Sequence, residues 1–176
     1  MAPLKDQGKL ITDPEKKAEL LNKTFQEAFS SGTSYTDEEI AEKCQMPLDE
    51  TSFKTMPNIK ITRTGVQKIL EKLDPSKAAG PDGITTRVLR NLSKEVAPIL
   101  TTIFQHSLKT GQVPTQWKKA NVTAIFKKGE HYVPSNYRPV SLTSITCKIM
   151  EHILVRNIMS HLEDNKILKD NQHCFI

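Results

Sequence analysis

Four stretches of the chain repeat apolar residues at the spacing of a helix, and a fifth alternates apolar and polar residues as a strand does. The first helical stretch is residues 12–29, where Thr12 or Asp13 can cap a helix that has Pro14 near its first position. Its apolar stripe is Ala18, Leu21, Phe25 and Phe29. The pattern predicts an amphipathic helix that needs a core to pack against.

Two further helices are predicted before the middle of the chain. The first has Thr62 or Thr64 as its cap and stops at Asp74-Pro75, because the residue before a proline is disfavoured in a helix. Its stripe is Val66, Ile69, Leu70 and Leu73. The second begins at Ser93, taken as a cap, and ends at Gly111 in a left-handed conformation. Its stripe is Val96, Ile99, Leu100, Ile103, Phe104 and Leu108.

The strand signal lies at residues 120–127. Ala120, Val122, Ala124 and Phe126 alternate with Asn121, Thr123, Ile125 and Lys127, so a strand would bury the first set and present the second on its other face. After a polar loop the chain returns through residues 137–140, which predicts a hairpin that brings Arg138 back toward Lys127. Arginine forks onto phosphate oxygens and lysine supplies a compact point charge, so this pair suits a phosphate-rich ligand.

A long helix is predicted after the hairpin, with Ser144 or Thr146 as its cap. Its stripe is Ile145, Ile149, Ile153, Leu154, Ile158 and Leu162. Residues 30–60 are different, because serines, Gly32, Pro47 and Pro57 interrupt any period, and they predict a linker with one short acidic helix. Asp37, Glu38 and Glu39 are adjacent and cannot share one helix face, which favours a solvated surface over a metal site.

The charge of the chain is unevenly distributed. Its 25 lysines and arginines exceed its 20 aspartates and glutamates, and the net charge of +5 favours a polyanionic partner. No acidic residue lies between Glu95 and Glu130. This acid-free window, residues 96–129, contains Lys109, Lys118, Lys119, Lys127 and Lys128. The positive field is therefore expected there.

Targeting and metal signals are absent from the sequence. Its 3 cysteines form no C-x-x-C pair and have no histidines at metal spacing, which favours reduced thiols and no structural zinc. No apolar run approaches the length of a membrane span, and the first residues lack the apolar region of a signal peptide. We expect an intracellular chain with no membrane partner, in either the nucleus or the cytoplasm.

The hairpin segment resembles a known family. Residues 125–129, Ile-Phe-Lys-Lys-Gly, and residues 136–142, Asn-Tyr-Arg-Pro-Val-Ser-Leu, look like the fingers hairpin of reverse transcriptases encoded by jockey-like non-LTR retrotransposons. Residues 77–84, Lys-Ala-Ala-Gly-Pro-Asp-Gly-Ile, resemble the Gly-Pro-Asp-Gly block that precedes this hairpin. By itself that block is a turn signal.

Further blocks occur in the same order as in that family. Val113-Pro114 with Trp117 resembles the lead into the strand, and residues 148–151 resemble the helix that follows. Residues 171–175 resemble a Gln-x-Gly-Phe block, except that Cys174 stands in the place of the glycine. The resemblance covers about residues 62–176, and residues 12–29 resemble the segment between the endonuclease and the polymerase in these elements.

The resemblance implies roles for five residues, and the acid-free window adds two more. Lys127 and Arg138 would contact the triphosphate of an incoming deoxynucleoside triphosphate, with Lys128 and Asn121 as neighbours on the nucleic-acid side. Lys77 would lie near the template path. Lys118 and Lys119, in the acid-free window, are expected to contact phosphates of an RNA or DNA template-primer. The alternative for Lys77, Lys118 and Lys119 is a plain solvated lysine.

The family's catalytic carboxylates, which hold two metal ions, come from an aspartate block and an Ala-Asp-Asp block that follow the Gln-x-Gly-Phe block. The sequence stops before either, so we expect no catalytic residue and no metal site in it, and no polymerase activity from it alone; Mg²⁺ belongs to the complete family enzyme. Part of the apolar stripes is expected to stay exposed, because a palm would cover them in that enzyme.

These observations predict an α/β fold, mostly helical with a small antiparallel hairpin or sheet, that forms the fingers portion of a right-hand polymerase. Residues 1–60 would be a helical pre-polymerase segment and linker, and residues 61–176 a partial reverse transcriptase domain truncated before the palm. The predicted function is that of a truncated RNA-directed DNA polymerase of a retrotransposon that binds template and nucleotide. The alternative is a non-enzymatic nucleic-acid-binding remnant.

Overall fold

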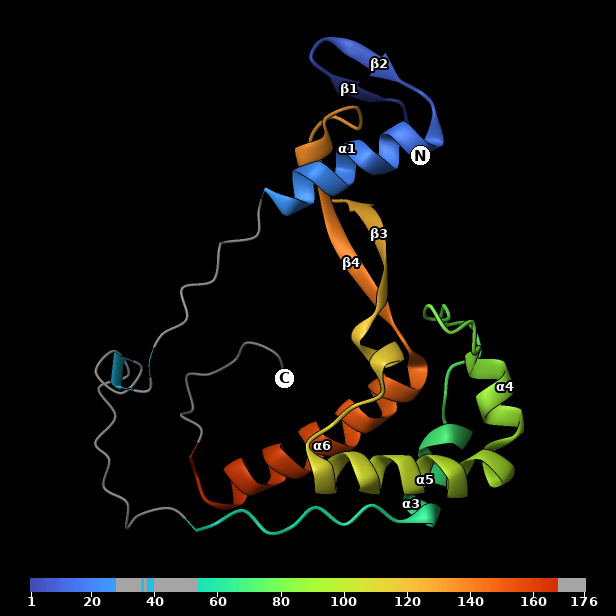
Figure 1. Cartoon of the computed structure of the whole chain (residues 1–176), viewed down its shortest axis with the longest axis vertical. Helices are drawn as coiled ribbons and strands as arrows, with labels where there is room; N and C mark the ends of the chain where they lie inside the picture. The colour runs from blue at the N-terminus through green and yellow to red at the C-terminus, as the bar shows by residue number, and fades with distance from the viewer. Residues whose placement is uncertain (28–35, 37, 40–53, 168–176) are drawn as a thin grey trace. The chain divides into compact units, whose positions relative to one another are not determined.

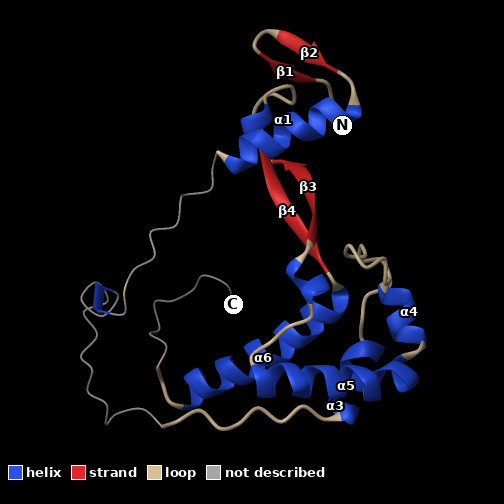
Figure 2. Cartoon of the chain, viewed as in Figure 1, coloured by secondary structure: helices blue, strands red, loops and turns tan. Residues whose placement is uncertain are grey.

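The computed structural model describes residues 1–27, 36, 38–39 and 54–167 (Figure 1). These residues form a mixed fold of helices with two small antiparallel hairpins, β1-β2 and β3-β4 (Figure 2), so the predicted combination of elements is confirmed. The chain divides into two compact units: unit 1 is residues 1–49 with 122–141, and unit 2 is residues 50–121 with 142–176. The predicted boundary after residue 60 stays a prediction.

Unit 1 begins with a hairpin that the hydrophobic pattern did not predict. Strands β1 (Leu4–Asp6) and β2 (Lys9–Ile11) pair antiparallel, with Leu4 opposite Ile11 and Asp6 opposite Lys9. Gln7 and Gly8 join them with φ of 44° and 87°. Two successive positive φ angles match the right-handed twist of a two-residue hairpin. Glutamine is not the usual first residue of such a turn, and each strand is too short to show alternation.

Helix α1 (Pro14–Gln26) confirms the first predicted helix, up to Gln26. Asp13 is its cap, and the carboxylate accepts a hydrogen bond from the backbone N–H of Lys16 at 2.9 Å. The core of unit 1 consists of Leu4, Leu21 and Tyr137, with Leu20, Phe25, Ala124 and Phe126 partly buried against it. Phe29 of the predicted stripe lies outside the described residues.

The central hairpin consists of β3 (Ala120–Phe126), the short 3-10 helix η2 (Pro134–Asn136) and β4 (Tyr137–Thr143), as predicted. The predicted burial of alternate residues is confirmed in part for Ala124 and Phe126, which are partly buried, and is wrong for Ala120 and Val122, which are exposed. The unit 1 core reaches only the tip of β3, and Val122 therefore keeps 59% of its surface exposed.

Unit 2 contains α3 (Arg63–Glu71), α4 (Thr86–Asn91), α5 (Ser93–Thr110), the 3-10 helix η1 (Thr115–Lys118) and α6 (Ile145–Asp164). The three long helices confirm the predicted ones. Thr62 caps α3 by accepting a hydrogen bond from the N–H of Gly65 at 3.1 Å, and Gly111 ends α5 with a φ of 68°. Helix α4, which Thr85 caps, was not predicted, because it is too short to show a period.

The prediction that Ser93 caps α5 is wrong. Ser93 is the first residue of the helix and is buried, while Leu92 occupies the cap position with φ −102° and ψ 26° and no side-chain hydrogen bond. Leu92 is also the C-cap of α4. The Leu92 backbone is not in the extended region that a capping residue typically adopts, and leucine has no side-chain acceptor.

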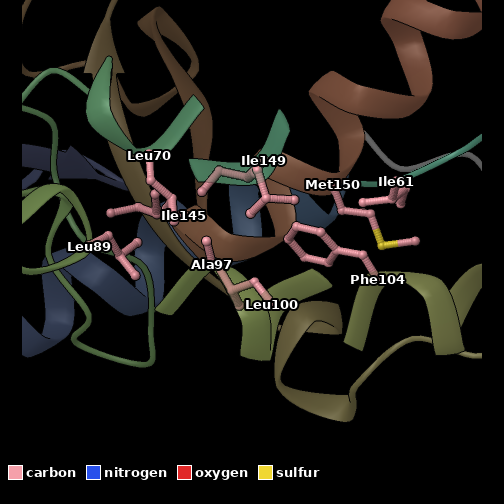
Figure 3. Packing of buried hydrophobic residues seen from close by; sticks show 10 residues of the cluster. Ile61, Leu70, Leu89, Ala97, Leu100, Phe104, Ile145, Ile149 and Met150 are labelled. Carbon is pink, nitrogen blue, oxygen red and sulfur yellow. The ribbon is translucent and has the colours of Figure 1, made fainter. Parts of the chain in front are cut away.

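The core of unit 2 gathers side chains from α3, α4, α5 and α6 (Figure 3). It consists of Ile61, Val66, Leu70, Leu89, Ala97, Leu100, Phe104, Ile145, Ile149 and Met150. Phe104 is fully buried, and its ring packs on that of Trp117 with centroids 5.7 Å apart. Helix α5 turns Ala97, Leu100 and Phe104 inward, so Ile99, which belongs to the predicted stripe, is 61% exposed.

Two predictions fall wholly or mostly outside the described residues: the block at 171–175, and the linker at 30–60. Within the linker, the hydroxyl of Thr36 accepts a hydrogen bond from the N–H of Glu39 at 3.3 Å, and the carboxylate of Glu39 accepts one from the N–H of Thr36 at 2.9 Å. This reciprocal pair is a helix-start arrangement. Across the described part of the chain, no helix is long and apolar enough to cross a membrane.

Candidate nucleic-acid interface

The tip of the central hairpin has a defined register. The backbone N–H of Lys127 donates to the carbonyl of Asn136 at 2.8 Å, which in an antiparallel ladder places Phe126 opposite Tyr137 and Ile125 opposite Arg138. The rings of Phe126 and Tyr137 meet edge to face with centroids 5.6 Å apart, as this register requires.

The two faces of the tip differ in chemistry. Phe126 and Tyr137 point into the unit 1 core. Because side chains alternate along a strand, Lys127 and Arg138 project from the opposite face, where both are exposed. They are diagonal neighbours in the ladder, a relationship that separates residues by about 7–8 Å. The predicted convergence of these two residues on one rim agrees with this register, whereas their ligand remains a prediction.

The loop from Lys128 to Asn136 is held by a network that the sequence reading missed. Gly129 has a φ of 89°, and a Cβ on it would lie 2.6 Å from the side chain of Asn136. The amide of Asn136 donates to the carbonyl of Glu130 at 3.0 Å, and the hydroxyl of Tyr137 donates to the carbonyl of His131 at 2.7 Å. These bonds fix the loop that joins Lys127 to Arg138.

Aromatic packing and the N-terminal hairpin complete this support. The imidazole of His131 stacks on Phe126 with centroids 3.8 Å apart. The backbone N–H of Lys5 donates to the carbonyl of Tyr132 at 2.7 Å, and its ammonium lies 5.8 Å from the Tyr132 ring centroid. Strand β1 therefore contacts the loop at Tyr132. In the sequence, the only indication of this packing is that His131 and Tyr132 lie close to Gly129 in the loop.

The remaining predicted site residues belong to unit 2 and are described with it. Lys118 ends η1 and Lys119 follows it, both exposed, as is Asn121 in β3. Trp117, next to Lys118, anchors this short segment on Phe104. Lys77 lies in the connection between α3 and α4, with its ammonium 4.0 Å from the carboxylate of Asp74. The structure thus groups Lys127, Lys128 and Arg138 in unit 1, and Lys118, Lys119 and Asn121 along one continuous segment.

The Gly-Pro-Asp-Gly turn is confirmed, and it is fastened to the start of α6. The N–H of Gly83 donates to the carbonyl of Gly80 at 3.1 Å, and Gly83 has a φ of 68°. A Cβ on Gly80 would lie 2.6 Å from the backbone N of Ser144. Ser144 occupies the cap position of α6, but its hydroxyl donates to the Asp82 carboxylate at 2.6 Å and makes no capping bond.

Two observations on the described residues concern metal ligands and a cysteine thiol. No group of three or more histidine, cysteine, aspartate or glutamate side chains among them could hold a metal ion. Burial raises the pKa of the Cys147 thiol to about 11, aided by its hydrogen bond to Glu151. The thiol is therefore protonated at neutral pH, the form that is a poor nucleophile.

No family model matches the chain, but curated relatives do. It is 26% identical over 160 residues to the RNA-directed DNA polymerase from mobile element jockey of Drosophila melanogaster, a match that covers 90% of the chain and 17% of the relative. It is 26% identical to the probable RNA-directed DNA polymerase from transposon BS of the same species, over 96% of the chain and 18% of the relative. The jockey polymerase of Drosophila funebris is 28% identical over 77% of the chain and 14% of the relative.

The chain thus spans less than a fifth of the length of these relatives. The resemblance that the hairpin motifs predicted is confirmed: over most of its length, the chain is similar to a limited portion of the RNA-directed DNA polymerases of jockey-like and other non-LTR retrotransposons.

Proposed function

We propose that these residues form the fingers portion of a retrotransposon RNA-directed DNA polymerase, where they bind a template-primer and an incoming deoxynucleoside triphosphate. The observation that carries the proposal is the exposed pair Lys127 and Arg138 on the outer face of a hairpin whose inner face is fixed by Phe126 and Tyr137. The packed inner face positions the backbone that carries the two cations before the ligand arrives, which lowers the ordering cost of binding a polyphosphate.

Within this proposal, Lys127 and Arg138 contact the triphosphate. The guanidinium forks onto phosphate oxygens, and the ammonium supplies a point charge. Lys128 and Asn121 lie on the nucleic-acid side, while Lys118, Lys119 and Lys77 contact template or primer phosphates. The relatives' reaction uses carboxylate-held metal ions, Mg²⁺ in this proposal, and the residues named here would position substrates around that chemistry without ligating the metal.

Titration with a fluorescent deoxynucleoside triphosphate tests the nucleotide site. K127A/R138A should weaken binding at least tenfold, because each charged hydrogen bond contributes about 1.5–3 kcal/mol. The control K16A/K94A removes two exposed lysines elsewhere, from α1 and α5, and should leave the affinity unchanged. Equal affinity of K127A/R138A and the unchanged chain would contradict the assignment.

The second candidate function is nucleic-acid binding without nucleotide binding, as a non-enzymatic module. The acid-free window favours it, because Lys118, Lys119, Lys127 and Lys128 are exposed there with no carboxylate among residues 96–129. Salt-sensitive binding of single-stranded RNA, together with no saturable triphosphate binding, would select this second function.

A further inference from the structure

A groove of about 500 Å³ lies in unit 2 between α3 and the first half of α6. Aliphatic side chains form its floor: Ile69, Leu73, Leu142, Ile145 and Ile149. The ionisable side chains that line it are Lys72, Lys77, Lys148 and His152, and no aspartate or glutamate is among the lining residues. An apolar floor is therefore bordered by basic groups alone.

Helix geometry makes the α6 side of this lining regular. Ile145 and Ile149 are four residues apart in α6, so the pair lies on one face of the helix. On the other side, Ile69 lies in α3 and Leu73 follows the end of that helix. Lys148 and His152 repeat the same spacing on α6, and both are exposed, as is Lys72. Since Lys77 is near Asp74 and has a proposed role at the template, the inference rests on Lys72, Lys148 and His152.

We propose that this groove binds an acidic amphipathic helix of a partner protein. Apolar side chains spaced one helical turn apart on such a helix would fill the floor, which is the helix-in-groove mode of recognition. Aspartates or glutamates flanking that stripe would meet the ammonium groups of Lys72 and Lys148, so the charges of the two surfaces are complementary.

The lining chemistry favours a peptide over a nucleic acid as the occupant. Single strands are bound by stacking bases on aromatic side chains, and no phenylalanine, tyrosine or tryptophan lines the groove. Its size falls within the range of about 300–1,000 Å³ found for ligand sites. The groove shares neither Lys127 nor Arg138 with the proposed nucleotide site, so the two proposals can fail independently.

Fluorescence anisotropy with a labelled synthetic helix tests the proposal. The probe carries leucines at positions i, i+3, i+4 and i+7 with glutamates on both flanks, and the control peptide has the same composition with its leucines spread around the helix. We expect the amphipathic probe to bind at least tenfold tighter than the control peptide and to weaken as salt rises. Equal binding of the two peptides would overturn the proposal.

Charge reversal locates the site. K72E/K148E should weaken the probe at least tenfold, whereas K16E/K94E, which makes the same change of net charge at exposed positions near the N-terminal ends of α1 and α5, should leave it unchanged. Near-ultraviolet circular dichroism at Trp117 verifies that each variant is folded. An equal loss in both double variants would overturn the proposal. A second outcome would also overturn it: K72E/K148E binds polyuridylate more weakly than the unchanged chain does but binds the probe equally well. That result would assign the groove to nucleic acid.

Discussion

Ser144 and Asp82 are 62 residues apart in the sequence, and the Ser144 hydroxyl donates a 2.6 Å hydrogen bond to the Asp82 carboxylate. Ser144 is fully buried, and its hydroxyl oxygen also lies 2.7 Å from that of Thr146. This bond fastens the turn before α4 to the residue that precedes α6, and so joins the Gly-Pro-Asp-Gly block to the start of that helix.

Loss of the Asp82 carboxylate should destabilise unit 2. D82A removes a charged acceptor from a buried hydroxyl, at an expected cost of about 1.5–3 kcal/mol in the free energy of unfolding. Urea denaturation followed by circular dichroism at Trp117 measures it. D6A, at an exposed carboxylate of β1, is the matched control and should cost much less. A D82A variant as stable as the unchanged chain would show that the bond contributes nothing net.

Gly80 and Gly83 should respond differently to alanine. The Cβ of G80A would meet the backbone of Thr143 and Ser144 at 2.6 Å, so the turn must move away from α6, and we expect a loss of about 1–3 kcal/mol. G83A meets open space but keeps a φ of 68°, which costs an L-residue about 1–2 kcal/mol. Proton–nitrogen spectra distinguish the two, because only G80A should shift the amides at the start of α6. Unshifted α6 amides in G80A would contradict this packing.

Salt dependence tests the lysines before β3. Each lysine that neutralises a phosphate of single-stranded RNA contributes roughly 0.7 to the slope of log affinity against log salt. K118A/K119A should therefore flatten the slope by roughly 1.4, whereas K16A/K94A should leave it unchanged. An unaltered slope in K118A/K119A would assign both residues to solvent.

Cys147 should react slowly with alkylating reagents. A pKa of about 11 in place of 9.0 lowers the thiolate fraction at pH 8 by about a hundredfold, and the rate of alkylation with it. The neutral thiol is the favoured form, so the rate should climb as pH rises toward 11. E151Q removes the neighbouring charge and should raise the rate at pH 8. Mass spectrometry of the peptide that contains Cys147 measures the rate, and reaction as fast as a free thiol would contradict the burial.

Local patterns predicted the helices at α1, α3, α5 and α6 and the central hairpin, because caps and periodicity act within a few residues. They could not predict α4 or the β1-β2 hairpin, which are too short to show a period. The other features that they missed depend on distant partners. The packing of α3, α4 and α6 determines which face of α5 is buried. Ile99 is therefore exposed to solvent, although its spacing fits the predicted stripe. The support of the hairpin loop by Lys5, and the bond between Asp82 and Ser144, likewise join segments far apart in the sequence.

The charged residues of the candidate site could be identified from the sequence, because the charge of a side chain follows from its residue type alone. The residues that orient them were not, since Asn136 and His131 look like any polar loop residues until their hydrogen-bond and stacking partners are known. The roles of Lys127, Arg138 and the other basic residues remain predictions for the experiments above.

The composition of the unit 1 core has a consequence for synthesis on the ribosome. Leu4 and Leu21 are translated first, and the third buried residue of that core, Tyr137, comes more than a hundred residues later. At about 5–20 residues per second, α1 leaves the exit tunnel on the order of ten seconds before the side chain that completes its core. During that interval the nascent helix exposes its apolar face, and it is then a natural substrate for a chaperone.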